Sequence, residues 1–133
     1  MSKILVVDDE PISRKIVSKI AQTLGHTTVH ASDGMRAWTT LEDNPDIALV
    51  CTDFEMPQLD GRELTRKIRS NRQHAELPIV MISGVILPHE LCALLSLGVD
   101  RFLPKPIDQG QLRGYLERFL PPLHRRANLR HAA

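Results

Sequence analysis

The sequence has few cysteines, few aromatic residues and no long apolar run. Its two cysteines, Cys51 and Cys92, both lie in apolar stretches, and we expect them to be buried free thiols rather than a disulfide or metal ligands. No apolar run approaches the roughly 20 residues that cross a bilayer. The first, residues 4–7, is also too short for the core of a signal peptide. We therefore expect a cytoplasmic protein without a membrane-spanning segment.

The sequence also lacks two common nucleotide-binding motifs, and residues 1–120 have no excess of basic residues. Among its seven glycines the chain shows neither Gly-x-x-x-x-Gly-Lys-Ser/Thr nor Gly-x-Gly-x-x-Gly. The net charge is +1, but three arginines lie in residues 121–133, where there is no acid. Residues 1–120 therefore carry a slight acidic excess. Because nucleic-acid-binding domains normally present a basic face, the body of the protein is not expected to bind nucleic acid.

What is present fits a single globular domain. Hydrophobic residues make up 42% of the 133 residues and charged residues 25%, the proportions of an ordinary globular protein. The length is that of one domain. We assign residues 1–120 to this domain and residues 121–133 to a basic tail. The tail is a helical extension, a solvated terminus or the stump of a linker, and its arginines provide at most a weak nucleic-acid contact.

Apolar β-branched segments alternate with amphipathic segments along the chain. The apolar segments predict strands at residues 4–7, 27–30, 47–51, 79–82 and 102–103. The amphipathic segments predict helices at residues 11–24, 33–43, 62–73, 88–97 and 108–120. Five strands that are each followed by a helix require right-handed crossovers, which predicts an α/β fold with a mostly parallel sheet covered on both faces. In such folds ligands bind at the carboxyl ends of the strands.

Polar residues follow four of the predicted strands: Asp8-Asp9-Glu10, Asp53, Ser83 and Lys105. Single acids near helix starts often cap them, and we interpret Glu10, Asp33 and Asp60 in that way or as solvated loop charges. The set as a whole needs another explanation, because neighbouring carboxylates repel one another unless a cation neutralises them. Hard oxygen ligands without a nearby His or Cys pair favour Mg²⁺.

A carboxylate, Mg²⁺, an ammonium group and a hydroxyl together make a phosphoryl-transfer site. Since the chain has no ATP-binding motif, the phosphoryl group has to come from a reactive donor. An Asp that acts as nucleophile and forms an acyl phosphate is the natural acceptor.

Four segments resemble the receiver domains of two-component response regulators, of the chemotaxis-regulator kind, in order and spacing. They are residues 4–11 (ILVVDDEP), 53–61 (DFEMPQLDG), 81–84 (MISG) and 102–106 (FLPKP). The likeness covers residues 3–120. It implies a bacterial phosphorelay receiver with a flavodoxin-like doubly wound (βα)₅ fold, strand order 2-1-3-4-5, in a single three-layer domain over residues 1–120.

The resemblance also implies how phosphorylation would proceed. Asp53 would accept the phosphoryl group from a histidine kinase or a histidine phosphotransfer protein. Asp9, Asp53 and the backbone carbonyl of Glu55 would hold Mg²⁺, with Mn²⁺ as an alternative, and Asp8 would act through a metal-bound water. The only chemistry expected is the domain's own phosphorylation and dephosphorylation, without turnover of an external substrate.

Further roles come from the same resemblance. Lys105 and Ser83 would contact the phosphoryl oxygens, and Phe102 would either shift inward with Ser83 or remain a static core residue. The side chains of Glu55 and Val85 would tune the lifetime of the acyl phosphate. Residues 86–120 would contact a downstream protein or a second copy of the chain.

Helix 88–97 carries its only charge, Glu90, in the first turn. An exposed apolar patch there would mark an interface with a partner. The alternative is a helix that is simply well buried.

Two other functions compete with the receiver. An aspartyl-phosphate phosphatase of the haloacid dehalogenase kind uses similar residues, but that family has Asp two positions after its nucleophile, where this chain has Glu55. A non-phosphorylatable interaction module on the same fold is the second alternative, and the intact acidic set argues against it.

Overall fold

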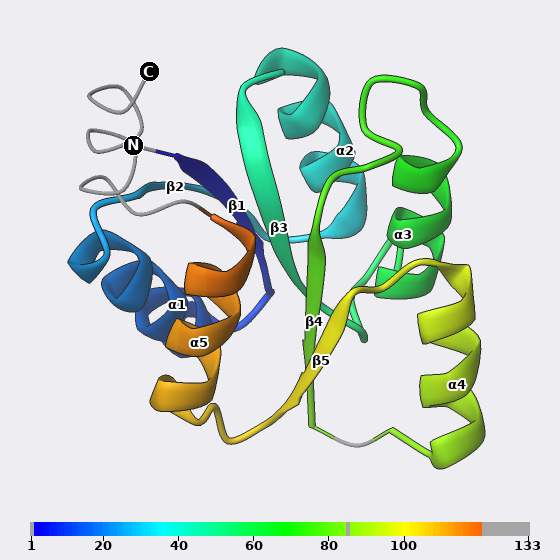
Figure 1. The fold of residues 1–133 in the computed structure, drawn as a ribbon. Helices are drawn as coiled ribbons and strands as arrows, with labels where there is room; N and C mark the ends of the chain where they lie inside the picture. The colour runs from blue at the N-terminus through cyan, green and yellow to red at the C-terminus, as the bar shows by residue number, and fades with distance from the viewer. Residues whose placement is uncertain (1, 85, 121–133) are drawn as a thin grey trace, which may run out of the picture.

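The computed structural model describes residues 2–84 and 86–120, in which five strands and five helices alternate (Figure 1). The strands are β1 (Lys3–Val7), β2 (Thr27–Ala31), β3 (Ile47–Asp53), β4 (Ile79–Ser83) and β5 (Arg101–Pro104). The helices are α1 (Pro11–Thr23), α2 (Gly34–Asp43), α3 (Gly61–Arg69), α4 (Pro88–Leu97) and α5 (Gln109–Phe119). No helix in the described residues is long and apolar enough to span a membrane.

All strand pairs are parallel, and the sheet has the order β2-β1-β3-β4-β5, which confirms the predicted fold. Helices α1 and α5 cover one face, and α2, α3 and α4 cover the other (Figure 1). Successive strand residues point to opposite faces, so Ile4 and Val6 join the core beneath α1 and α5, whereas Leu5 and Val7 join the other core. Burial on both faces explains why β1, β3 and β4 read as nearly continuous apolar runs.

Side-chain caps fix where three helices begin. Asp33, Asp60 and Asp108 each accept a hydrogen bond from a backbone N–H in the first turn of α2, α3 and α5, at 2.8, 2.9 and 2.9 Å. The interpretation of Asp33 and Asp60 as capping residues is therefore confirmed. Helix α4 ends at its C-cap residue, Gly98, which adopts a φ of +125°, a backbone conformation that favours glycine.

The periodicity predicted that this helix extends to residue 73, but α3 ends at Arg69. The last buried residue of its apolar stripe is Ile68, and the side chain of Asn71 accepts a hydrogen bond from the backbone N–H of Gln73 at 2.9 Å. This local bond competes with a further helical turn. The chain then turns so that His74 is buried, with its ring edge-on to Trp38 of α2.

Arg69 also bonds to three segments near the amino ends of β4 and β5: the loop before β4, the end of α4 and the residue before β5. Its guanidinium donates to the carbonyl oxygens of Ala75, Leu77 and Gly98 and to Oδ2 of Asp100, at 2.7 to 3.1 Å. The same Asp100 oxygen accepts the backbone N–H of Ile79 at 2.8 Å. One side chain thus fixes the carboxyl end of α4 to the starts of β4 and β5.

The two cysteines differ in exposure. Cys51 on β3 is buried, as expected, but Cys92 on α4 is exposed, so the prediction of two buried thiols is wrong for Cys92. Only Leu94 of α4 is fully buried, while Leu87 before the helix and Leu95 within it are 51% and 46% exposed. The alternative of a well-buried helix is therefore wrong, because α4 enters the core along one narrow stripe. Leu91 and Leu97 are partly buried, and the side chains of Leu87 and Leu95 face outward.

Candidate functional site

The polar residues that end the strands meet at one edge of the sheet. Asp53 is the last residue of β3 and Ser83 the last of β4, while Asp8 and Lys105 come just after β1 and β5. Because the strands are parallel and in register, these ends lie side by side. The structure thus brings together the carboxylates, hydroxyl and amine that the sequence analysis placed there.

Four carboxylates form the centre of this site. One oxygen from each of Asp8, Asp9, Glu10 and Asp53 lies within 4.8 Å of those of the others. Asp8 and Asp53 are buried, whereas Asp9 and Glu10 are exposed. We refer to these four residues as the acidic cluster.

Glu10 belongs to the acidic cluster, which corrects its interpretation as a capping residue, although its side chain is exposed as a loop charge would be. It occupies the N-cap position of α1, but its side chain makes no capping hydrogen bond. Its Oε1 lies instead 3.0 Å from the Nζ of Lys105. Adjacency to Asp8-Asp9 in the sequence was the signal for this role.

Lys105 is the cation of the site. Its Nζ lies 3.2 Å from Oδ2 of Asp53, 3.2 Å from Oδ2 of Asp8 and 3.0 Å from Oε1 of Glu10. The backbone N–H of Lys105 donates to the carbonyl of Ser83 at 2.9 Å, which holds the turn after β5 against β4. A single ammonium faces four carboxylates, so the site retains a net negative charge.

Burial governs the protonation of the two inner carboxylates. Burial raises the pKa of Asp8 above its ordinary value, although the backbone N–H of Glu10 and the charge of Lys105 oppose this. Burial also raises the pKa of Asp53, and the neighbouring Asp8 charge raises it further. For Lys105 burial favours the neutral amine, but the bond to Glu10 and the charges of Asp53 and Asp8 outweigh it and raise the pKa. The ionised cluster is therefore costly without a further cation.

Backbone contacts hold Asp53 in place. Its Oδ1 accepts the N–H of Phe54 at 2.7 Å, and its carbonyl accepts the hydroxyl of Thr52 at 2.9 Å. The loop after β3 folds back so closely that a Cβ on Gly61 would lie 2.6 Å from the Asp53 carbonyl oxygen. Only glycine fits at position 61 without a shift of the backbone, which explains why Gly61 follows the N-cap residue Asp60 at the start of α3.

A cavity of about 380 Å³ opens above these groups. The predicted site residues that line it are Asp9, Asp53, Glu55, Ser83 and Lys105, together with Glu10 and Gly84. Ser83 is 3% exposed, and Glu55 is exposed. The cavity is large enough for a phosphoryl group together with a hydrated cation.

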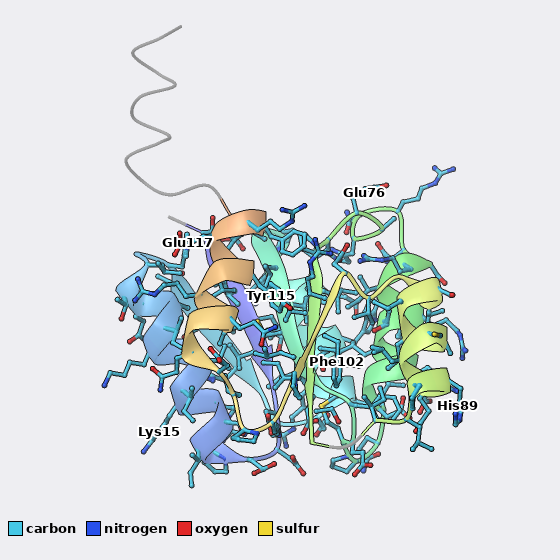
Figure 2. All side chains as sticks on the ribbon, turned by 60° about the horizontal axis from the view of Figure 1, so that its bottom comes forward. Lys15, Glu76, His89, Phe102, Tyr115 and Glu117 are labelled. Atoms are coloured by element: carbon cyan, nitrogen blue, oxygen red, sulfur yellow. The ribbon has the colours of Figure 1, made fainter. Side chains whose placement is uncertain are left out.

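Of the remaining predicted site residues, Asp8 is not among the described residues that line this cavity, Phe102 lies away from it and Val85 is outside the described chain. Phe102 does not line the cavity; it is partly buried on β5 and packs against the core beneath α2, α3 and α4. Figure 2 shows it with Tyr115 of α5 to one side and His89 of α4 to the other. Val85 and the tail at residues 121–133 lie outside the described residues.

The fold and the acidic strand ends define a class of signalling domain. The profile of the response regulator receiver domain family matches residues 4–117, and the chain belongs to this family. Among curated proteins it is similar to the chemotaxis protein CheY homolog of Campylobacter jejuni, with 34% identity over 116 residues, which cover 86% of this chain and 89% of the relative.

Solved structures agree with this assignment. The structure is similar to chemotaxis protein CheY4 of Vibrio cholerae, with a TM-score of 0.83 and 28% identity over 90% of this chain and 99% of that one. It is also similar to the receiver domain of the sensor histidine kinase PA1611 from Pseudomonas aeruginosa, with a TM-score of 0.79 and 26% identity, over 89% of this chain and 96% of that one. That receiver has a magnesium ion coordinated in its active-site cleft.

The donor chemistry of the acidic cluster fits a divalent cation. All four groups offer carboxylate oxygens, and no His or Cys within residues 2–84 and 86–120 belongs to the cluster. Oxygen ligands of this kind suit hard cations such as Mg²⁺ and Mn²⁺ rather than zinc or copper. A divalent cation would also offset part of the negative charge that Lys105 leaves uncompensated.

Proposed function

We propose that this receiver domain accepts a phosphoryl group on Asp53 from the phosphohistidine of a histidine kinase or phosphotransfer protein. One observation carries the proposal: the Asp53 carboxylate borders an open cavity while Lys105 and the acidic cluster surround it. A buried carboxylate with a fixed ammonium on one side and cation ligands on the other is arranged for nucleophilic attack on phosphorus.

The reaction transfers the phosphoryl group from nitrogen to oxygen. One Asp53 oxygen attacks phosphorus, the new P–O bond gives an acyl phosphate, and the P–N bond breaks with its electron pair on the departing imidazole. Asp53 Oδ1 is held by the Phe54 N–H, so its other oxygen, Oδ2, faces Lys105 and is the attacking atom. Lys105 neutralises charge on the phosphoryl oxygens, and the Ser83 hydroxyl donates a hydrogen bond to one of them.

Asp9, Asp53 and the Glu55 carbonyl would hold Mg²⁺, with Asp8 contributing through a water. The bound cation supplies charge neutralisation for the phosphoryl oxygens. The cation in the cleft of the PA1611 receiver and the four converging carboxylates support this part of the proposal. The exposed side chain of Glu55 beside the cavity would influence how readily water attacks the acyl phosphate.

Output would pass through the surface formed by α4, β5 and α5, within residues 86–120. Exposed Leu87 and Leu95 provide apolar area for a downstream protein or for a second copy of the chain. Phosphorylation adds about 1.5 to 2 negative charges beside Ser83. Ser83 ends the strand next to β5, which carries Phe102, so the new charge acts close to this surface.

Acetyl phosphate with Mg²⁺ tests the proposal. Intact-protein mass spectrometry should show one phosphoryl group on the wild type and none on Asp53→Asn. Asp46→Asn, which removes an exposed carboxylate paired with Lys3, serves as the matched control and should be phosphorylated like the wild type. Equal uptake by wild type and Asp53→Asn would overturn the assignment, and steady hydrolysis of a phosphomonoester would favour the phosphatase instead.

A further inference from the structure

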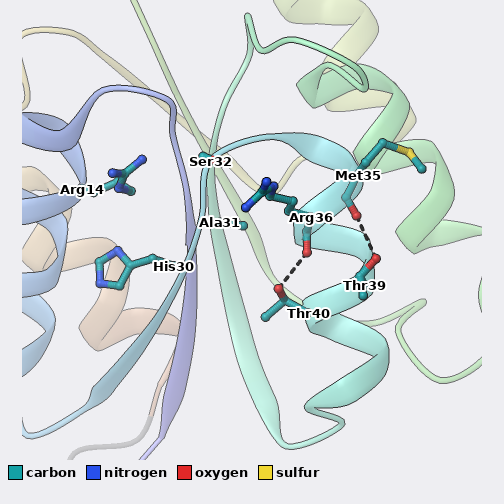
Figure 3. A pocket seen from close by; sticks show the side chains of 8 residues that line it. All are labelled: Arg14, His30, Ala31, Ser32, Met35, Arg36, Thr39 and Thr40. Carbon is teal, nitrogen blue, oxygen red and sulfur yellow. Dashed lines mark hydrogen bonds between the residues drawn. The ribbon is translucent and has the colours of Figure 1, made fainter.

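A second cavity, of about 640 Å³, lies between α1, β2 and α2. Its walls include Arg14 of α1, His30 of β2, and Met35, Arg36 and Thr39 of α2 (Figure 3). Its volume is in the range of about 300 to 1,000 Å³ that is common for sites that bind small molecules. None of the residues that line the acidic cavity lines this one, so the two are separate.

The charge of this cavity is positive. Within the part of the chain that the structure describes, two arginines and a histidine line it, and no Asp or Glu does. Arg14 donates one N–H to the backbone carbonyl of Asp8 at 2.6 Å, which leaves other donors of its guanidinium available. Arg36 Nε lies 3.6 Å from Oδ2 of Asp33, a contact at the edge of ion-pair range on a side chain that is 76% exposed. Such an exposed pair holds Arg36 weakly.

The remaining walls offer acceptors and an apolar surface. The hydroxyls of Thr39 and Thr40 donate to the carbonyls of Met35 and Arg36 at 3.2 and 2.7 Å, so their oxygens keep lone pairs for a ligand (Figure 3). Met35 is 50% exposed and lines the cavity, so it presents apolar surface there. The cavity therefore suits a ligand that joins an anionic group to an uncharged body, and it is larger than a simple inorganic anion needs.

We propose that this cavity binds a small organic phosphate, with the phosphoryl group between Arg14 and Arg36 and the uncharged body against Met35 and Thr39. Guanidinium groups match phosphate through paired N–H donors. Two of them compensate the double charge of a terminal phosphate. In Figure 3 the guanidinium of Arg36 is directed toward the side where Arg14 and His30 lie, as such a clamp requires.

Titration with adenosine 5′-monophosphate, followed by amide NMR of the ¹⁵N-labelled protein in EDTA, tests this site. EDTA prevents a divalent cation from bridging the nucleotide to the acidic cluster. We expect shifts to concentrate at Arg14, Ser32, Arg36 and Thr39. Uncharged adenosine and inorganic phosphate should each bind about tenfold more weakly or worse, since each lacks one half of the recognised ligand.

Three variants separate this cavity from general electrostatics. Arg14→Gln and Arg36→Gln should each weaken binding by about tenfold, the loss expected when one charge-assisted contact is removed. Lys15→Gln removes the same charge from α1 at a residue that does not line this cavity, and it should change the affinity by less than about twofold. Arg36 is highly exposed, so its substitution leaves the fold intact and keeps the test decisive even if Arg14→Gln unfolds.

Nucleotide binding in this cavity does not depend on phosphorylation of Asp53. Asp53→Asn should therefore bind the nucleotide like the wild type. The proposal is overturned if no amide shifts occur up to about 10 mM nucleotide, a concentration far above that of a specific site. It is also overturned if the shifts lie at the ends of β1 and β3, if Lys15→Gln weakens binding as much as Arg36→Gln, or if inorganic phosphate binds as tightly as the nucleotide.

Discussion

Lys105 Nζ lies 3.2 Å from Oδ2 of Asp53, although the two residues are 52 positions apart in the sequence. Between them lie α3, β4, α4 and β5, and the parallel register of β3, β4 and β5 brings the two ends of this segment together. The pair offsets part of the repulsion among the carboxylates of the acidic cluster. The pair does not remove this repulsion, because one lysine faces the four carboxylates of the cluster.

The uncompensated charge predicts that Asp53→Asn stabilises the metal-free protein. The amide keeps an acceptor for the Phe54 N–H and removes one buried negative charge. A gain of about 1 kcal/mol would raise the Tm by roughly 4 °C. Lys105→Met should lower the Tm, since Lys105 is the only cation among the described residues that is ion-paired with the acidic cluster. Glu117→Gln, at an exposed position of α5, is the control and should leave the Tm nearly unchanged (Figure 2). A lower Tm for Asp53→Asn would show that the cluster is not repulsive.

Mg²⁺ should stabilise the wild type more than it stabilises Asp9→Asn. A ligand that binds only the folded state at a concentration 100 times its Kd adds about 2.7 kcal/mol. Asp9 is an exposed member of the acidic cluster that lines the cavity with Asp53, and it is one of the proposed direct ligands, so its loss should remove most of that gain. Thermal denaturation with and without MgCl₂ measures the effect. Equal Tm shifts in both proteins would place the cation elsewhere.

The two thiols should react at very different rates. Burial raises the pKa of Cys51 to about 12, so it holds almost no thiolate at neutral pH, whereas Cys92 is exposed on α4. Ellman's reagent should titrate one thiol in the native wild type and two after addition of guanidinium chloride. Native Cys92→Ser should show no rapid reaction. A fast second thiol in the native wild type would contradict the burial of Cys51.

The His30 ring should make stability fall in mild acid. Partial burial and then the charge of Arg14 lower the pKa of His30 below its ordinary value of 6.5. The unfolded chain therefore takes up the proton first, so the contribution is fully present above pH 6.5 and is lost as the pH falls toward the lower pKa of the folded state. Urea unfolding at about pH 8 and about pH 5.5, followed by Trp38 fluorescence, measures the difference. His30→Gln should show a smaller decline, and an identical decline in both proteins would contradict the prediction.

Arg69→Met should destabilise the fold strongly. The substitution leaves the Asp100 carboxylate and three backbone carbonyls without the guanidinium, which we expect to cost about 2 to 4 kcal/mol. Arg66→Met on the same helix, at an exposed position, should change the free energy of unfolding by less than about 0.5 kcal/mol. Urea denaturation distinguishes the two, and similar losses would mean that the bonds of Arg69 contribute little.

The sequence predicted the order of the elements and most of the acidic site, because both depend on periodicity. Apolar runs buried on both faces identify strands, and parallel strands bring residues that follow them to one edge. Asp8, Asp53, Ser83 and Lys105 could thus be placed together from the strand pattern alone. The end of α3 was missed, since it depends on a local hydrogen bond of Asn71.

Side-chain direction and spacing between helices were not predictable in the same way. Helix α4 is apolar on several sides, so its composition could not show that Cys92 faces outward. The N-cap position of Glu10 gave no indication that its side chain turns toward Lys105. The cavity between Arg14 and Arg36 depends on how far α1 and α2 stand apart across β2, which no local pattern encodes.

The hydrogen bonds of Arg69 hold α4 at its carboxyl end. The Gly98 carbonyl at its carboxyl end is held by two guanidinium nitrogens, while its first turn follows the loop after Ser83. A displacement of the strand end at Ser83 would reach α4 at its first turn, at the end opposite the one that Arg69 holds. A partner that contacts the first turn of α4 would therefore lie at the end of the helix that follows Ser83, away from the bonds of Arg69.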